Sequence, residues 1–130
     1  MTELQTGITG RAEDTVTEET TAAAMCSGVL PVYATPRMTA MMEYTAWSSV
    51  QPYLEEGKGT VGTRLDIRHL AASPLGSHIT YESELTEIDR RKLVFYVAAY
   101  DEGGKIGEGV HERFIVDNAK FMEKAQSKLK

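Results

Sequence analysis

The residues of this chain that could do chemistry include a glutamate and a histidine in separate segments. Glu43 lies inside the methionine-rich stretch MTAMMEYTAW, where an inward-pointing carboxylate would be desolvated and could act as a base or a nucleophile. An isolated glutamate in such a stretch more often points outward to solvent. His69 ends the segment TRLDIRH, and an imidazole can transfer protons near neutral pH, although a histidine at a strand end is often a surface residue.

Thr35, Gly62 and Arg113 each have a structural and a functional interpretation. Thr35 precedes a proline, so its first expected role is to cap a helix, with its hydroxyl about 12 Å along the axis from Glu43. Gly62 interrupts a predicted strand, where glycine often marks the close approach of a ligand or another backbone. His111 and Arg113 alternate onto one face of the last predicted strand. Arg113 could hold a phosphate or carboxylate there, or belong to a solvated face with ion pairs.

The sequence lacks the short motifs that mark several common enzyme classes. It contains no GxGxxG, P-loop, GxSxG or HExxH motif. Cys26 is the only cysteine, so no internal disulfide can form, and one Cys with three His cannot fill a structural zinc site. We expect no metal, a packed Cys26 thiol and an intracellular compartment.

The composition favours one acidic globular domain over residues 1–130, with 42% hydrophobic and 25% charged residues. The chain has 14 Lys+Arg against 19 Asp+Glu, and this net charge of -5 argues against a nucleic-acid partner. No apolar run approaches the roughly 20 residues needed to cross a bilayer, and the N-terminus has no secretory signal pattern. We therefore expect a cytoplasmic protein without a membrane partner.

The elements that would position these side chains follow from the spacing of apolar residues. A helix of about four turns is predicted over 36–52, because apolar and small residues recur at i, i+3, i+4 and i+7, and we expect it to be buried on most sides. A short strand near 15–17 precedes it, with one or two helical turns at 20–25. Hairpin-linked strands follow, which predicts an antiparallel sheet crossed by the helix, an α+β fold. The predicted later elements are strands near 60–70, 79–87, 93–100 and 106–116, and a polar helix at 118–128.

Three segments together resemble the fluoroacetyl-CoA thioesterase family of hotdog-fold proteins. They are ATPRMTAMMEYTA, GTVGTRLDIRHLAASPLG, and IGEGVHERFIVD with the KFMEK that follows, in a likeness from about Ile8 to Lys124. The resemblance implies a hotdog fold, in which an antiparallel sheet wraps around one long central helix. It also implies a homodimer with acyl-CoA clefts between the subunits. The implied activity is hydrolysis of an acyl-CoA thioester to free acid and CoA, with the CoA ester as substrate and no cofactor.

The resemblance also implies roles for individual residues. It matches Thr35, Glu43 and His69 to the family's catalytic residues, and Gly62 and Arg113 to residues of the substrate site. Glu43 would be the nucleophile or general base, and His69 would orient and transfer protons. Thr35 would hydrogen-bond the carboxylate or the substrate carbonyl. A backbone N–H near Gly62 would stabilise the oxyanion, and Arg113 would hold substrate or the wall of the site.

The chain departs from the fluoroacetyl-specific members before the helix. The stretch CSGVLPVYATP is shorter and contains no Phe, and a proline follows Thr35 where those members have glycine. We therefore expect a broader or different short-chain acyl-CoA substrate. A non-catalytic acyl-CoA or small-ligand binding protein stays open, and a hotdog dehydratase ranks last because no His/Asp pair lies in one segment. Four basic residues could supply cations for the CoA phosphates, although ordinary surface charge is the favoured interpretation of all four: Lys58, Arg64, Arg68 and Lys105.

Overall fold

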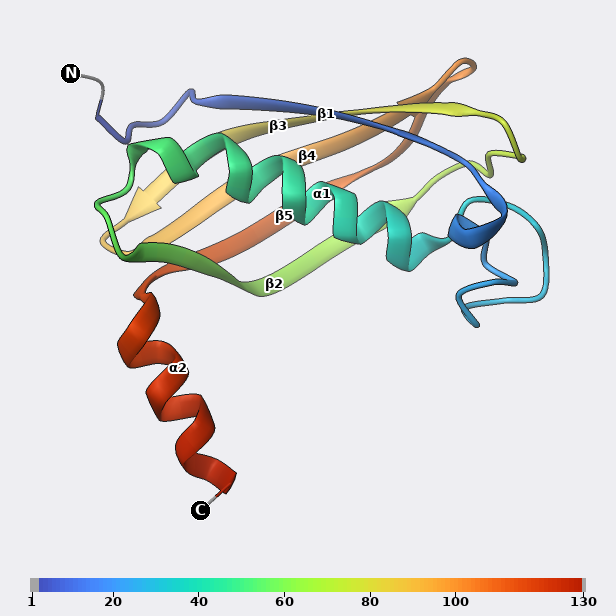
Figure 1. Cartoon of the computed structure of the whole chain (residues 1–130). Coiled ribbons are helices and arrows are strands. Elements are labelled where there is room, and N and C mark those ends of the chain that lie inside the picture. The colour runs from blue at the N-terminus through green and yellow to red at the C-terminus, as the bar shows by residue number, and fades with distance from the viewer. Residues whose placement is uncertain (1–2, 130) are drawn as a thin grey trace.

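Five β-strands form one antiparallel sheet, and a helix lies across one face of it (Figure 1). The computed structural model describes residues 3–129. The strand order is β1-β3-β4-β5-β2, so β1 and β2 form the two edges, and the predicted α+β architecture is confirmed. The elements in chain order are β1 (Thr9–Thr15), α1 (Thr35–Val50), β2 (Lys58–His69), β3 (His78–Asp89), β4 (Lys92–Asp101), β5 (Gly104–Asp117) and α2 (Asn118–Gln126), with 3-10 turns at Glu18–Thr20, Gln51–Tyr53 and Ser127–Leu129.

Helix α1 buries one side against the sheet and leaves the other open. Met38, Met42 and Ala46 are fully buried and pack in one apolar cluster with side chains from β3 and β4. On the opposite side, Tyr44 and Trp47 remain 46% and 37% exposed. The expectation of a helix buried on most sides is therefore wrong for the single chain, because only one sheet face covers it. With 16 residues, α1 is of ordinary length rather than long.

The start of α1 differs from the prediction by one residue, and the difference changes the role of Thr35. Ala34 is the N-cap and Thr35 is the first helical residue, while no side chain caps the helix. The expected capping role of Thr35 is therefore wrong, and its hydroxyl is free to bond elsewhere. The strand predicted near 15–17 is also misplaced: β1 pairs with β3 over Thr9–Thr15 and overlaps the prediction only at Thr15.

The segment between β1 and α1 is a loop rather than a helical turn over 20–25. Thr21 and Val32 form isolated backbone bridges with Tyr33 and Pro74, which hold its two ends. Cys26 lies in this loop with a positive φ of 59° and is exposed. The expected packing of its thiol is therefore wrong, because the loop passes outside the apolar cluster.

The edge strand β2 carries an irregularity beside its glycine. Gly62 pairs with Arg113 of β5, but the register shifts before the next pair, in which Arg64 lies opposite Glu112. Such bulges re-aim side chains and are common next to active sites. His69 is the last residue of the same strand. No helix within residues 3–129 is long and apolar enough to cross a bilayer.

Candidate active site

The first group of candidate residues joins the start of α1 to the end of β2. Thr35 Oγ1 lies 2.8 Å from His69 Nδ1, so the hydroxyl and the imidazole share a hydrogen bond. His69 Nε2 is buried and has no hydrogen-bond partner among residues 3–129. Buried polar atoms are usually hydrogen-bonded, so this nitrogen is open to a bond with a ligand or with water. A hydroxyl within reach of an imidazole is the geometry that proton transfer requires.

Backbone pairing brings these two distant segments together. The Tyr33 N–H donates to the Ser73 carbonyl at 2.9 Å, and the Ala34 N–H donates to the Thr20 carbonyl at 2.9 Å. Ser73 belongs to the turn that follows His69. The chain entering α1 is therefore fixed to that turn, and this pairing sets Thr35 against the imidazole.

A cleft of about 330 Å³ opens beside the Thr35–His69 pair. Apolar side chains, including Val32, Leu70 and Ala71, line it together with Thr35, His69 and two further hydroxyl-bearing residues, Ser27 and Tyr33. Its volume is at the lower end of the range for small-molecule sites. The cleft is therefore suited to a small apolar group brought against the hydroxyl and the imidazole.

Burial controls the charge of His69. Removing the imidazole from water disfavours its charged form and lowers the pKa of His69 below its ordinary value, and the backbone at Ala71 opposes this shift only in part. His69 is therefore neutral at pH 7, with one ring nitrogen able to accept a proton.

The second group surrounds Glu43 in the middle of α1. Glu43 Oε2 is paired with Arg113 Nη1 at 3.4 Å. The Glu43 side chain is 36% exposed, whereas that of Arg113 is 7% exposed. Glu43 therefore points neither into the apolar core nor fully to solvent. Its carboxylate lies against β2 and β5, where a buried cation holds one of its oxygens.

Arg113 is itself fixed by two residues of the sheet, Thr60 and His111. Its Nε donates to Thr60 Oγ1 at 2.8 Å, and its Nη2 donates to the Thr60 carbonyl at 3.0 Å. Its Nη1 lies 3.1 Å from His111 Nε2, while His111 Nδ1 lies 2.8 Å from the Arg64 carbonyl. Because a carbonyl can only accept, Nδ1 carries the proton and Nε2 accepts from Arg113. His111 is therefore held as one neutral tautomer.

The neutral state of His111 has a physical cause. Burial lowers the pKa of His111, the bond to the Arg64 carbonyl opposes the shift, and the charge of Arg113 adds to it. His111 and Arg113 are 0% and 6% exposed, so the interpretation of this strand face as solvated is wrong. The alternation of side chains along the strand predicts that His111 and Arg113 share one face. The contact of Thr60 with Arg113 is not predicted, because nothing in the local sequence distinguishes Thr60 from other strand threonines.

Gly62 leaves the space that the Glu43 carboxylate occupies. A Cβ at this position would lie 2.6 Å from Glu43 Oε2 and 3.3 Å from Arg113 Nη1. The close approach expected at this glycine is therefore made by a side chain of α1. Any larger residue at position 62 would displace the carboxylate or its cation.

The five predicted site residues thus form two groups. Thr35 bonds to His69, while Glu43 lies with Gly62 and Arg113, and no hydrogen bond within residues 3–129 joins the groups. Thr35 and Glu43 are eight residues apart on α1, which is about 12 Å along the axis. The carboxylate is therefore not the hydrogen-bond partner of Thr35 within one chain.

Two of the four cations considered for CoA phosphates are already paired. Arg64 contacts Glu112 at 3.2 Å, and Lys105 contacts Glu108 at 2.8 Å. Both pairs are at least partly exposed, which is typical of ordinary surface charge.

Comparison with known proteins assigns most of the chain to one family. Residues 16–119 match the family model described as fluoroacetyl-CoA-specific thioesterase. The fluoroacetyl-CoA thioesterase of Streptantibioticus cattleyicolor is 38% identical over 97 residues, which cover 75% of this chain and 70% of that protein.

Solved structures agree with this assignment and confirm the hotdog fold. A variant of the fluoroacetyl-CoA enzyme in complex with acetyl-CoA has a TM-score of 0.90 and 29% identity, covering 98% of this chain and 100% of that chain. A thioesterase superfamily member from Thermus thermophilus has a TM-score of 0.88 and 32% identity, covering 99% of this chain and 95% of that chain.

We expect the imidazoles of His69 and His111 to titrate below pH 6.5, because burial disfavours the imidazolium form of both rings. Two-dimensional 1H–15N NMR of the imidazole signals over roughly pH 4–8 measures this directly. Spectra of His69→Gln and His111→Gln assign the signals. A midpoint at or above 6.5 for either ring would contradict its burial.

We expect Thr60→Val to destabilise the fold by about 1.5–3 kcal/mol, because the charged Arg113 Nε–H loses its side-chain acceptor in a buried site. Urea unfolding measures the change. The control is Thr63→Val on the same strand, whose exposed hydroxyl bonds only to the Glu112 carbonyl at 3.2 Å, with an expected change within about 0.5 kcal/mol. Equal effects of the two variants would show that Thr60 does not hold Arg113.

Proposed function

This chain belongs to the family of fluoroacetyl-CoA-specific thioesterases and hydrolyses acyl-CoA thioesters to free acid and CoA, and we propose that Thr35, Glu43 and His69 carry this reaction. The observation that carries the proposal is the 2.8 Å contact between Thr35 Oγ1 and His69 Nδ1 beside a small cleft. The buried, unpartnered His69 Nε2 supports it, since a reacting group would complete the hydrogen bonding of the ring.

The proposed substrate is a short-chain acyl-CoA without a requirement for fluorine. Small and apolar residues line the cleft beside Thr35, and its volume of about 330 Å³ suits a short aliphatic group. The stretch before α1 contains no Phe to select a fluorinated group. A short acyl group is therefore the part of the substrate proposed to enter this cleft.

The proposed catalytic unit is a homodimer in which β2 pairs with β2 of a second copy. β2 is an edge strand, and its exposed Leu65 (43%) supports an interface at this edge. We place the two-fold axis of the antiparallel β2 pair between Leu65 and Asp66. Residues equidistant from this axis pair with each other, so Gly62 would lie opposite the partner's His69. This register would bring Glu43 toward the Thr35–His69 pair of the second copy.

Glu43, His69 and Thr35 have different proposed roles in the hydrolysis. The Glu43 carboxylate either attacks the thioester carbonyl carbon, forming an anhydride that water hydrolyses, or takes the proton of an attacking water. In the first route the CoA sulfur leaves as a thiolate when the anhydride forms, and neutral His69 then takes the proton of the water that hydrolyses the anhydride and passes it to the thiolate. In the second route the water proton taken by Glu43 passes to the sulfur through His69 as the C–S bond breaks. Thr35 orients the imidazole through Nδ1 and hydrogen-bonds the substrate carbonyl.

Arg113 is proposed to position the carboxylate. Its Nε and Nη2 are already bonded to Thr60, and its Nη1 contacts both His111 and Glu43. Little donor capacity is left for substrate. The guanidinium therefore supports the proposed mechanism by holding the Glu43 carboxylate in one orientation.

We expect release of CoA thiol from short-chain acyl-CoAs, measured over a panel from acetyl-CoA to octanoyl-CoA with fluoroacetyl-CoA included. Glu43→Gln and His69→Ala should each lower kcat by about 10²–10⁴-fold, because each removes a group that transfers a proton or attacks the carbonyl. Binding of acyl-CoA without turnover by the unmodified protein would instead favour a non-catalytic binding protein.

Mixing the two inactive variants tests the shared cleft. If Glu43 acts with His69 of the other copy, each mixed dimer has one intact site, and random exchange should restore about one quarter of the activity. If both residues act within one copy, every site carries a lesion and mixing restores nothing. Solution mass provides the companion measurement, since a strict monomer would contradict the dimer.

We expect Gly62→Ala to lower kcat by tenfold or more, because the new Cβ would lie 2.6 Å from Glu43 Oε2 and must displace it. The protein should still fold, since Gly62 does not have a positive φ and alanine is compatible with a strand there. Gly103→Ala, in the hairpin turn between β4 and β5, is the control and should leave kcat unchanged. Equal rates for both variants would contradict the role of Gly62.

A further inference from the structure

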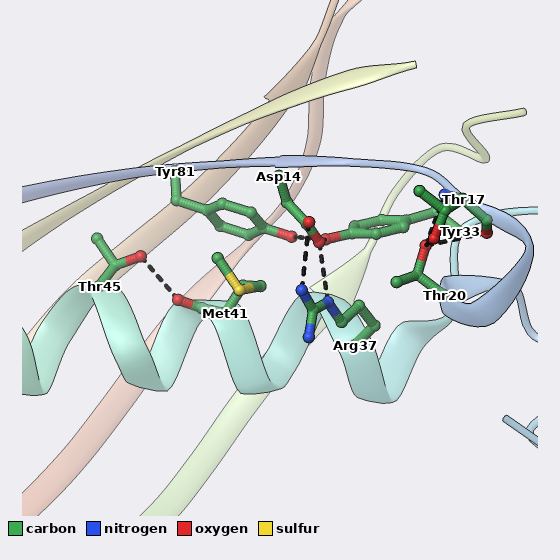
Figure 2. A network of polar contacts seen from close by, with 8 residues as sticks. All are labelled: Asp14, Thr17, Thr20, Tyr33, Arg37, Met41, Thr45 and Tyr81. Atoms are coloured by element: carbon green, nitrogen blue, oxygen red, sulfur yellow. Dashed lines mark hydrogen bonds and ion pairs between the residues drawn. The ribbon is translucent and has the colours of Figure 1, made fainter. Parts of the chain in front are cut away.

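A polar network outside the two groups of candidate residues lies at the start of α1 (Figure 2). The Tyr33 hydroxyl donates to Asp14 Oδ2 at 2.6 Å and lies 2.5 Å from the Tyr81 hydroxyl. Arg37 Nε and Nη2 donate to the two oxygens of Asp14 at 2.9 and 3.2 Å. One carboxylate thus accepts from a tyrosine and, through both of its oxygens, from an arginine. Because the Tyr33 proton goes to Asp14, the hydroxyl of Tyr81 donates to Tyr33.

The network is shielded from water and fixed in its charge state. Tyr33 and Tyr81 are 1% and 0% exposed, and the Asp14 side chain is 13% exposed. Burial raises the pKa of Asp14, but the hydrogen bonds from Arg37 and Tyr33 outweigh it, so the pKa lies below its ordinary value. Burial and the neighbouring Asp14 raise the pKa of Tyr33. A paired carboxylate and neutral phenols therefore persist at neutral pH.

The placement of this network relates it to Thr35. Tyr33 and Arg37 lie two residues before and two residues after Thr35, and Asp14 of β1 bonds to both. Helix α1 has no side-chain cap, because Ala34 occupies the N-cap position. A carboxylate bonded to both sides of the first turn can fix the helix start, and its negative charge is favourable near a helix N-terminus.

We propose that Asp14 is a positioning residue for the thioester hydrolysis: by holding Tyr33 and Arg37, it fixes the start of α1 so that the Thr35 hydroxyl stays against His69 Nδ1. The inference rests on the proposed roles of Thr35 and His69. Ala12 of β1 lies opposite Tyr81 of β3, so Asp14, two residues on, shares the sheet face of Tyr81. The sheet therefore anchors the carboxylate, and the carboxylate anchors the helix.

The kinetic test is Asp14→Asn, which nearly keeps the shape of the side chain but removes its charge. We expect kcat to fall by about ten- to a hundredfold through misplacement of the Thr35 hydroxyl, with KM changed less than about threefold. In a Thr35→Ala background the same substitution should cause no further loss of kcat, because its effect passes through Thr35. Losses that simply multiply in the double variant would overturn the proposal.

The control is Glu13→Gln on the same strand. The Glu13 carboxylate contacts the His78 ring at 2.7 Å and is 57% exposed, so this variant also removes a carboxylate charge from β1 but leaves the start of α1 intact. Its kcat should match that of the unmodified protein. A loss equal to that of Asp14→Asn would indicate a general effect of charge on β1 and would contradict the proposal.

A measurement without substrate separates this inference from the proposed function. The imidazole 15N signals of His69 should shift in Thr35→Val, which removes the hydroxyl at Nδ1, and Asp14→Asn should reproduce that shift while leaving the His111 signals in place. If Asp14→Asn does not fold, Arg37→Gln breaks the same pair from its more exposed partner and should give the same shift. Unchanged His69 signals in a folded variant would overturn the inference, whereas absence of thiol release by the unmodified protein would overturn the proposed function alone.

Discussion

The packing of the methionine face of α1 against the sheet is the constraint on which the rest of the structure depends. Because Met38 and Met42 are fully buried, the rotation of the helix about its axis is fixed. Each residue adds about 100° around the axis, so Glu43 is turned from the core toward β2 and β5, and Tyr44 reaches solvent. The apolar face thus determines where the one carboxylate of α1 points, although it makes no polar contact itself.

A buried cation then has to be satisfied at the place where Glu43 meets the sheet. The Arg113 side chain is 7% exposed, and burial alone would make its charge costly. Thr60, neutral His111 and Glu43 supply its acceptors, and burial lowers the pKa of Arg113 while Glu43 opposes the shift. A pair whose carboxylate is 36% exposed adds little net stability, but it holds one oxygen of Glu43 against the guanidinium. Gly62 completes the arrangement because any side chain there would meet the carboxylate.

The sequence predicts the elements well because their signals are local. The helical spacing at 36–52, the hairpin turns and the same-face alternation of His111 and Arg113 all agree with the structure. The hydrogen bond between Thr35 and His69 could not be predicted from local pattern, since backbone pairing between Tyr33 and Ser73, forty residues apart, brings the two side chains together. The bond between Asp14 and Arg37 likewise spans distant segments. The exposure of Cys26 depends on the path of a loop, for which no periodic pattern exists.

The loop that carries Cys26 offers an experimental use that does not require changing the protein. Its thiol is exposed and is the only one in the sequence, and the neighbouring Ser27 lines the cleft beside Thr35. A maleimide dye would therefore attach at one known position next to the cleft. The fluorescence of the dye could then report when a ligand fills the cleft, without any substitution in the protein. For the same reason, assays that detect free thiols must account for one reactive sulfur per chain.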